Sequence, residues 1–234
     1  MLTIFLAYSL FTLALPAPGQ EKLFLDNVKA RMVESLDTFQ KNQQLASLSL
    51  AMFMGPEYRL EHAGGYADIG HKVNATPDHI YTLASVSKTI TGAVIIDLIS
   101  QRRLAIDDSV FRYIAGFPKN VTLLDLLNHT SGFQRENENE YYLSNSSYSD
   151  IIKYLPKQLK YKQHRYANIN YAALGALVEK VTGEPFAKVA SDYYFRITGE
   201  PLYFANQNNS DSQRHFVKNY VRRYNRPYLH KLVD

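Results

Sequence analysis

Two side chains that together suit acyl-transfer chemistry, Ser85 and Lys88, lie three positions apart in the segment YTLASVSKTITG (residues 81–92). A serine hydroxyl becomes a strong nucleophile when a neighbouring base takes its proton, and a lysine partly withdrawn from water can be that base. The spacing S-x-x-K occurs once in the chain. On its own it also fits two unrelated surface residues, so the serine–lysine hypothesis needs support from the elements around it.

The segment after this pair predicts a helix. Apolar side chains recur at helical spacing in AVIIDLISQ (residues 93–101), and small residues precede them. Residues three apart share one face of a helix, so Ser85 and Lys88 are expected side by side on its first turn. Backbone N–H groups at a helix start also face any negative charge that develops there.

A second pair with chemical potential stands in RYANINY, where Tyr166 and Asn168 form the only Y-x-N of the chain. A tyrosine near a lysine can move protons, and an asparagine side chain can hold a substrate amide. The alternative is a packed tyrosine followed by a helix cap. The apolar segment NINYAALGALVEKVTG (residues 168–183) predicts a helix closed by Gly183.

The remaining pattern predicts a mixture of helices and strands. An apolar stripe of Leu25, Val28, Met32, Leu36 and Phe39 predicts a helix, and two strands are expected near residues 46–54 and from residue 58, with a turn at Gly55. A short helix within VTLLDLLNHTSGF (residues 121–133) should stop at Gly132, and residues 134–150 should form a surface loop. Residues 1–19 have a short apolar run broken by proline, which predicts a signal peptide and an exported protein.

The motifs SVSK, LLNHTSGF and YANINYAALGALVEKVTG occur in the order found in the serine beta-lactamase and penicillin-binding-protein superfamily, which this chain resembles from about residue 43 to about residue 205. It is most similar to the branch of class C beta-lactamases, D-aminopeptidases and esterases. The resemblance implies an α+β, beta-lactamase/transpeptidase-like fold: an antiparallel sheet with flanking helices and a mostly helical subdomain. It implies a serine hydrolase that cleaves an amide or ester bond, such as that of a beta-lactam, a D-Ala peptide or a small ester, through an acyl-enzyme.

The resemblance also suggests roles for individual residues. Ser85 is similar to the acylated nucleophile, and Lys88 to its proton partner. Tyr166 resembles the group that shuttles protons between the serine and the leaving group. Asn168 resembles the residue that binds the substrate amide and orients the lysine, whereas His129 belongs to a structural turn. The implied partner is a small molecule or a peptidoglycan-like peptide.

One family feature has no counterpart here. The family carries a third motif, Lys/His-Thr-Gly, on a later strand that supplies the second oxyanion N–H, and none occurs between Asn168 and Asp234. We therefore expect residues 20–234 to be the N-terminal part of such a domain, with C-terminal strands missing and activity impaired. A non-catalytic relative that binds cell-wall peptides or beta-lactams is the alternative.

The composition narrows the remaining classes. A chain of 234 residues with 46% hydrophobic residues can form one domain with a substantial core. The absence of cysteine excludes disulfides and thiolate chemistry, and scattered histidines predict no metal site; no cofactor is expected. Tyrosines alternate with arginines in the tail HFVKNYVRRYNRPYLHKLVD, but a net charge of +4 argues only weakly for an anionic partner. The tail is interpreted as a solvated segment, and no nucleic acid is expected.

Overall fold

The computed structural model describes residues 20–55, 58–133, 151–153, 155, 158, 162–204, 216–217, 220–223 and 226–229. They form two compact units. One contains the described residues up to Tyr81 together with the C-terminal segments from Phe216 to Leu229, and the other contains those from Thr82 to Phe204. The predicted signal peptide and the predicted loop 134–150 lie outside the described residues.

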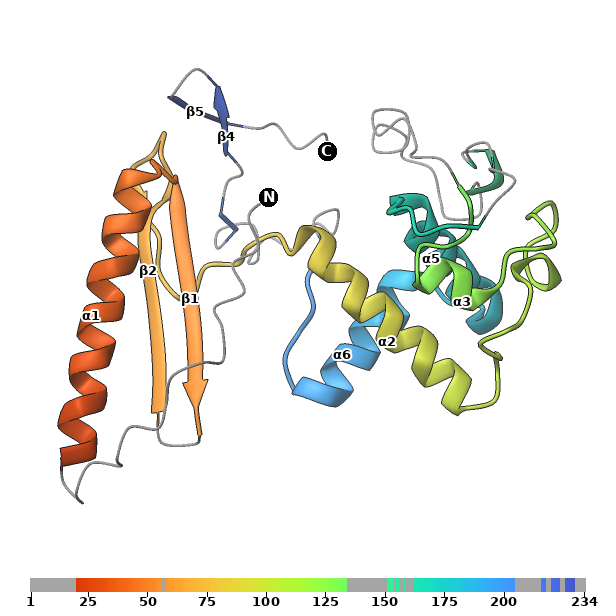
Figure 1. The fold of residues 1–234 in the computed structure, drawn as a ribbon, viewed down its shortest axis with the longest axis horizontal. Helices are drawn as coiled ribbons and strands as arrows, with labels where there is room; N and C mark the ends of the chain where they lie inside the picture. The colour runs from red at the N-terminus through yellow and green to blue at the C-terminus, as the bar shows by residue number, and fades with distance from the viewer. Residues whose placement is uncertain are drawn as a thin grey trace. The chain divides into compact units, whose positions relative to one another are not determined.

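The first unit is a helix packed on an antiparallel sheet (Figure 1). Helix α1 (Gln20–Asn42) lies along strands β1 (Ser47–Met54) and β2 (Tyr58–Asp68), which pair from Ser47 opposite Gly65 to Met54 opposite Tyr58. The short strand β3 (Val73–Asn74) adds to the other edge of β2. The predicted helix and strand pair are confirmed.

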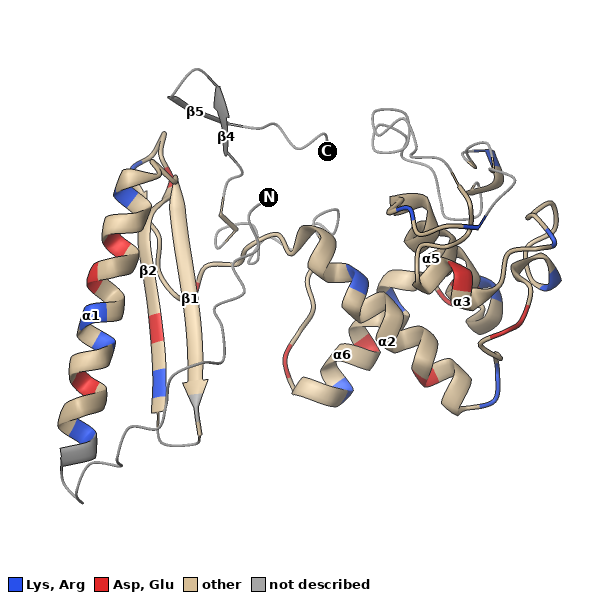
Figure 2. Ribbon diagram, viewed as in Figure 1, with Lys and Arg blue, Asp and Glu red and all other residues tan. Residues whose placement is uncertain are grey.

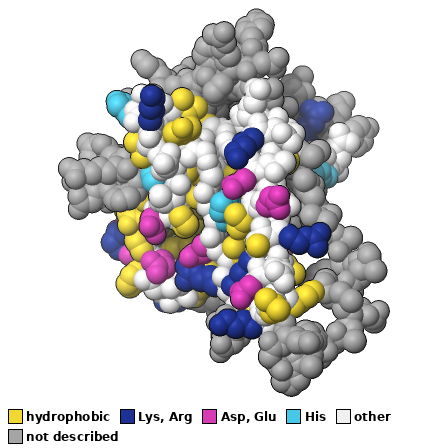
Figure 3. All heavy atoms as spheres, turned by 90° about the vertical axis from the view of Figure 1, so that its left-hand side faces the viewer, with side chains coloured by type: hydrophobic (Ala, Val, Ile, Leu, Met, Phe, Trp, Pro, Cys, Tyr) yellow, Lys and Arg dark blue, Asp and Glu magenta, His cyan; other side chains and the backbone are white. Residues whose placement is uncertain are grey.

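The apolar stripe of α1 explains how the helix docks. Four of its five predicted members are half-buried, whereas Phe39 is exposed. A polar contact adds to this packing, because Asp37 Oδ1 lies 2.8 Å from His62 Nε2 of β2. Lysines, arginines, aspartates and glutamates alternate along the rest of α1 (Figure 2). Charges of both signs are also interspersed over the described residues of the face in Figure 3.

The described part of the tail contains regular secondary structure. Strands β4 (Tyr220–Arg223) and β5 (Arg226–Leu229) pair as an antiparallel two-stranded sheet. Just before them, Val217 N–H donates to the Ile80 carbonyl at 3.0 Å. Tyrosine and valine are residues that strands favour, but the pairing of two short strands depends on contacts between them that the composition of the tail does not show.

The second unit is helical and holds the main core. It contains α2 (Ser87–Ser100), α3 (Leu123–Leu127), α5 (Asn168–Thr182) and α6 (Phe186–Thr198), with 3-10 turns η1 (Ala84–Val86) and η2 (Val110–Arg112). Helix α5 is the centre of this unit, since residues 172–178 are all buried. Figure 1 shows α2, α3 and α6 around it. Gly183 ends α5 in the left-handed conformation, as predicted, with φ 76°.

Two predicted helix boundaries are wrong. Ser85 lies in η1 rather than in the first turn of α2, although η1 leads directly into the helix. Helix α3 ends at Leu127 with Asn128 as its cap, well before Gly132. His129 already has a positive φ of 57°, which ends the helical path earlier than the glycine does.

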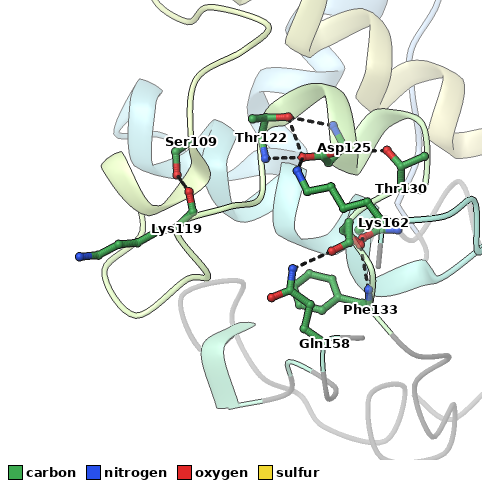
Figure 4. A network of polar contacts seen from close by, with 10 residues as sticks. Ser109, Lys119, Thr122, Asp125, Thr130, Phe133, Gln158 and Lys162 are labelled. Carbon is green, nitrogen blue, oxygen red and sulfur yellow. Dashed lines mark hydrogen bonds and ion pairs between the residues drawn. The ribbon is translucent and has the colours of Figure 1, made fainter. Parts of the chain in front are cut away.

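A polar network fixes α3 and the residues after it (Figure 4). Thr122 Oγ1 accepts from the N–H of Asp125, and the Asp125 carboxylate accepts from the N–H and hydroxyl of Thr122, which forms a capping box. Lys162 donates to the same carboxylate, and the Thr130 hydroxyl donates to its other oxygen at 3.2 Å. Burial raises the pKa of Asp125, but the bonds from Lys162 and Thr122 outweigh it and hold that pKa below its ordinary value.

We expect Asp125→Asn to lower the free energy of unfolding at neutral pH by about 1–2 kcal/mol, because a capping box and a charged hydrogen bond are both weakened. Because the pKa of Asp125 is lowered in the folded state, its carboxylate stabilises the fold at pH values above the unfolded-state pKa. This stabilisation is lost as the pH falls through the folded-state pKa. The variant should therefore lose less stability than the wild type below about pH 4. Urea unfolding measures both effects. Asp192→Asn is the control, since its pair with Lys188 is exposed; an equal loss in both variants would contradict the prediction.

In the part of the chain that the structure describes, no helix combines the length and apolar character needed to cross a membrane.

Candidate active site

Ser85 is presented by a strained turn. It is the middle residue of η1, and Ala84 before it has a φ of 46°, in the left-handed region that an alanine rarely adopts. Such strain costs on the order of 1–3 kcal/mol and persists where the surrounding structure enforces it. The Ser85 side chain is exposed at this point. The local backbone thus holds the hydroxyl out of the core at the mouth of α2.

Three of the predicted site residues meet at this hydroxyl. Ser85 Oγ lies 2.7 Å from the Tyr166 hydroxyl and 3.3 Å from Lys88 Nζ, which donates to it. Ser85 comes from η1, and Lys88, three positions later, comes from the start of α2. The tyrosine comes from a segment 81 residues away. The serine therefore has two proton-transfer groups within hydrogen-bond distance.

Lys88 lies over aromatic rings. Its half-buried ammonium group is 5.1 Å from the centroid of the Tyr166 ring and 5.8 Å from that of Tyr171. Both distances fall within the range of cation–π attraction. The two rings restrict where the ammonium can lie and so keep it beside Ser85. Lys88 lies beside Ser85 as the spacing of three predicts, although Ser85 is in η1 and Lys88 is in α2.

The two tyrosines under Lys88 differ in their hydroxyl partners. Tyr166 is 45% exposed and its hydroxyl contacts Ser85, whereas the Tyr171 hydroxyl donates to the Leu127 carbonyl at 3.2 Å. Burial raises the pKa of Tyr171, and a negative charge on Tyr166 raises it further. Tyr171 thus stays neutral at physiological pH. Of these two phenols, Tyr166 is the one placed to exchange a proton with the serine.

Asn168, the fourth predicted residue, opens α5 two positions after Tyr166 and is half-buried. Two buried polar residues near Tyr166 were not among the predicted site residues. His129 and Asn170 are 9% and 0% exposed, and the His129 ring centroid lies 4.5 Å from that of Tyr166. An asparagine within an otherwise apolar helix was the available signal, because a fully buried amide must find partners. His129 was assigned to a structural turn only.

The site has a serine, an amine and a phenol, a set suited to covalent acyl transfer rather than to metal catalysis. Across the described ranges, no three histidine, aspartate or glutamate side chains cluster in a way that could hold a metal ion. The first N–H groups of a helix have no intrahelical acceptor. The N–H of Ser85, at the start of η1, is thus a donor available to an oxyanion.

Comparison with solved structures supports the fold. A D-amino acid amidase from Ochrobactrum anthropi SV3 has a TM-score of 0.70 at 21% identity, covering 84% of this chain and 57% of the amidase. A class C beta-lactamase from Rhodobacter sphaeroides also has a TM-score of 0.70, at 20% identity, covering 86% of this chain and 57% of the lactamase. The predicted α+β, beta-lactamase/transpeptidase-like fold is confirmed.

Sequence comparison shows the family. A teichoic acid D-alanine hydrolase of Staphylococcus aureus (strain MRSA252) is 28% identical over 206 residues, which are 83% of this chain and 49% of the relative. The chain spans about half the length of the curated relatives it matches. A family model described as Beta-lactamase matches residues 30–223. The chain therefore belongs to the beta-lactamase family.

Proposed function

We propose that this chain carries the nucleophile of a serine hydrolase that cleaves amide or ester bonds through an acyl-enzyme. The observation that supports this most directly is the placement of Ser85 Oγ between Tyr166 and Lys88, at 2.7 and 3.3 Å. Distances of this size allow proton transfer without rearrangement. Membership of the beta-lactamase family agrees with the proposal.

The reaction follows from these contacts. Tyr166, with Lys88 beside it, takes the proton of Ser85 as Oγ attacks the substrate carbonyl carbon. The tetrahedral oxyanion is stabilised by the N–H of Ser85. When the carbon–nitrogen or carbon–oxygen bond breaks, the proton passes from Tyr166 to the leaving group, which leaves an ester on Ser85. Water then attacks this ester by the reverse proton path and releases the acid. We assign to Asn168, the first residue of α5, the role of holding the substrate amide.

The proposed substrates contain a D-alanyl or similar D-amino acyl bond, or a beta-lactam ring. The names of three relatives support this range: a teichoic acid D-alanine hydrolase, a D-amino acid amidase and a class C beta-lactamase. A polymer such as teichoic acid, or a peptidoglycan-like peptide, would lie outside the cytoplasm. An exported protein is consistent with the apolar segment in residues 1–19.

The first test concerns turnover. Acyl transfer uses two donors aimed at the oxyanion, and losing one costs about 10²–10³-fold in kcat. We propose the N–H of Ser85 as one of them. We expect a p-nitrophenyl ester of D-alanine to give a burst of about one equivalent of p-nitrophenol and then slow release. Absence of a burst above that of Ser85→Ala would contradict an acyl-enzyme.

A second candidate function is binding of these substrates without cleavage. A fluorescent penicillin separates the two functions. A hydrolase retains the label on the denatured chain, because the acyl group is covalently attached to Ser85. A binding protein shows fluorescence polarisation in the native state and loses the label on denaturation.

A further inference from the structure

The segment that presents Tyr166 lacks regular secondary structure and depends on contacts from the turn after α3. Residues 162–167 form neither helix nor strand. The N–H of Arg165 donates to the His129 carbonyl at 2.7 Å, and the N–H of Ala167 donates to His129 Nδ1 at 3.3 Å. One histidine thus holds the backbone on both sides of Tyr166.

The direction of these hydrogen bonds determines the tautomer of His129. A backbone N–H can only donate, so Nδ1 of His129 must carry a lone pair and the ring proton must sit on Nε2. The Asn170 amide Nδ2 lies 3.0 Å from the same nitrogen and donates to it as well. His129 is therefore neutral here, and its Nδ1 accepts from two donors.

The other side of Asn170 fixes the orientation of its amide. Ser131 Oγ donates to Asn170 Oδ1 at 2.7 Å, and the N–H of Phe133 donates to Ser131 Oγ at 3.3 Å. A backbone N–H stands at each end of this chain of bonds, so no member can reverse its role. Ser131 and Asn170 are 1% and 0% exposed, which makes each of these bonds costly to lose.

The imidazole also contacts the phenol directly. Its centroid lies 4.5 Å from that of Tyr166 and 5.2 Å from that of Tyr171, with interplanar angles of 36° and 37°. The titratable groups facing the ring are these two tyrosines and His164, 6.2 Å away, with the Lys88 ammonium over the tyrosines. The Asp125–Lys162 pair tethers the beginning of the same segment. His129 thus acts on both the backbone and the ring of Tyr166.

We propose that His129 is a positioning residue: its neutral, Nε2-protonated form holds the Tyr166 hydroxyl against Ser85 for proton transfer. When Nδ1 is protonated it becomes a donor and can no longer accept from the Ala167 N–H and the Asn170 amide. Loss of these hydrogen bonds releases the segment that carries Tyr166. The inference rests on the proposed function of Tyr166. Misplacement of a reacting group by about 1 Å can cost on the order of 10²-fold in rate, which sets the expected effect.

Two substitutions separate the acceptor from the ring. His129→Asn keeps an oxygen acceptor near the Nδ1 position and tolerates the positive φ, but it loses the ring and cannot titrate. His129→Phe keeps a ring and loses the acceptor. We measure kinact and KI for a fluorophosphonate reacting with the 234-residue chain. We expect His129→Phe to lower kinact about 10²-fold and His129→Asn to lower it by less than about tenfold, with KI unchanged in both.

The decisive comparison repeats His129→Phe in a Tyr166→Phe background. If His129 acts through Tyr166, the double variant should react no more slowly than Tyr166→Phe alone. The proposal would be overturned if the two substitutions lowered kinact by factors that multiply in the double variant. An undiminished kinact in folded His129→Phe would also overturn it. Ser131→Ala serves if His129→Phe does not fold: it should lower kinact several-fold with KI unchanged. An unchanged kinact would overturn the proposal there. His71→Gln, at an exposed histidine of the other unit, is the control for removing an imidazole.

Two further readouts do not follow from a merely structural role. Between about pH 5 and pH 8, kinact of the wild type should fall on acidification more steeply than that of His129→Asn; equal slopes would overturn the release step. In the ¹⁵N spectrum of imidazole-labelled chain, His129 Nδ1 should be unprotonated at neutral pH, and a protonated Nδ1 would overturn the proposal. The ¹⁵N measurement needs no enzymatic activity, so it tests the tautomer of His129 even if Ser85 is never labelled and the proposed function fails.

Discussion

Ser85→Ala should remove hydrolysis of p-nitrophenyl esters and nitrocefin, lowering the rate on the order of 10³-fold or more. The substitution deletes the hydroxyl that lies within hydrogen-bond distance of both Tyr166 and Lys88. Because Ser85 is exposed in η1, its removal creates no cavity. Stability should therefore be unchanged within about 0.5 kcal/mol. Initial rates of chromophore release, with urea unfolding of the same samples, measure both quantities.

Ser87→Ala is the matched control for this prediction. Ser87 is also exposed and lies two residues away, but its hydroxyl donates to the Ala84 carbonyl at 2.6 Å and contacts neither proton-transfer group in the described structure. We expect it to retain activity within about tenfold, the effect of one neutral hydrogen bond. Comparable losses in both variants would show that the turn, and not the Ser85 hydroxyl, is what the reaction requires.

Tyr166→Phe should lower the rate of acylation by about 10²–10⁴-fold, the range of general acid–base catalysis. It removes the hydroxyl 2.7 Å from Ser85 Oγ but keeps the ring that packs against His129 and lies under Lys88. Substrate affinity should change little because the group acts on the transferred proton. Pre-steady-state burst rates as a function of substrate concentration separate the two effects.

Tyr171→Phe tests whether the second phenol under Lys88 could take this role. Its hydroxyl contacts a backbone carbonyl and its pKa is raised, so losing it should cost about 1 kcal/mol of stability and less than about tenfold in rate. Lys88→Arg tests the lysine in the same way, because arginine keeps the positive charge but cannot readily give up a proton. Lys88→Arg and Tyr166→Phe, as single variants, should each alter the pH–rate profile. A larger loss in Tyr171→Phe than in Tyr166→Phe would reverse the assignment.

Local features of the site followed from the sequence. The Ser85–Lys88 contact depends on a spacing of three, which brings the two side chains together at the junction of η1 and α2 as it would within a single helical turn. The start and end of α5 also followed, because Gly183 ends an apolar helix in a left-handed conformation. The pairing of Tyr166 with Ser85 spans 81 residues, and only the order of the family's motifs connected the two.

The sequence could not reveal what positions the tyrosine. His129, Ser131 and Asn170 belong to two elements that meet only in the folded unit, and the direction of their hydrogen bonds depends on backbone N–H groups of other segments. Helix α3 was predicted to run to Gly132 because glycine is the usual stop signal. The chain turns earlier, at His129, whose positive φ places its ring under Tyr166.

The central claim, that Ser85 is the acylated nucleophile, is tested most directly by mapping a covalent adduct. The 234-residue chain is treated with a fluorophosphonate and with a penicillin, denatured, digested and sequenced by mass spectrometry. We predict both adducts on Ser85, with labelling slowed in Tyr166→Phe and absent in Ser85→Ala. Labelling of another residue, or undiminished labelling of Ser85→Ala, would contradict the account.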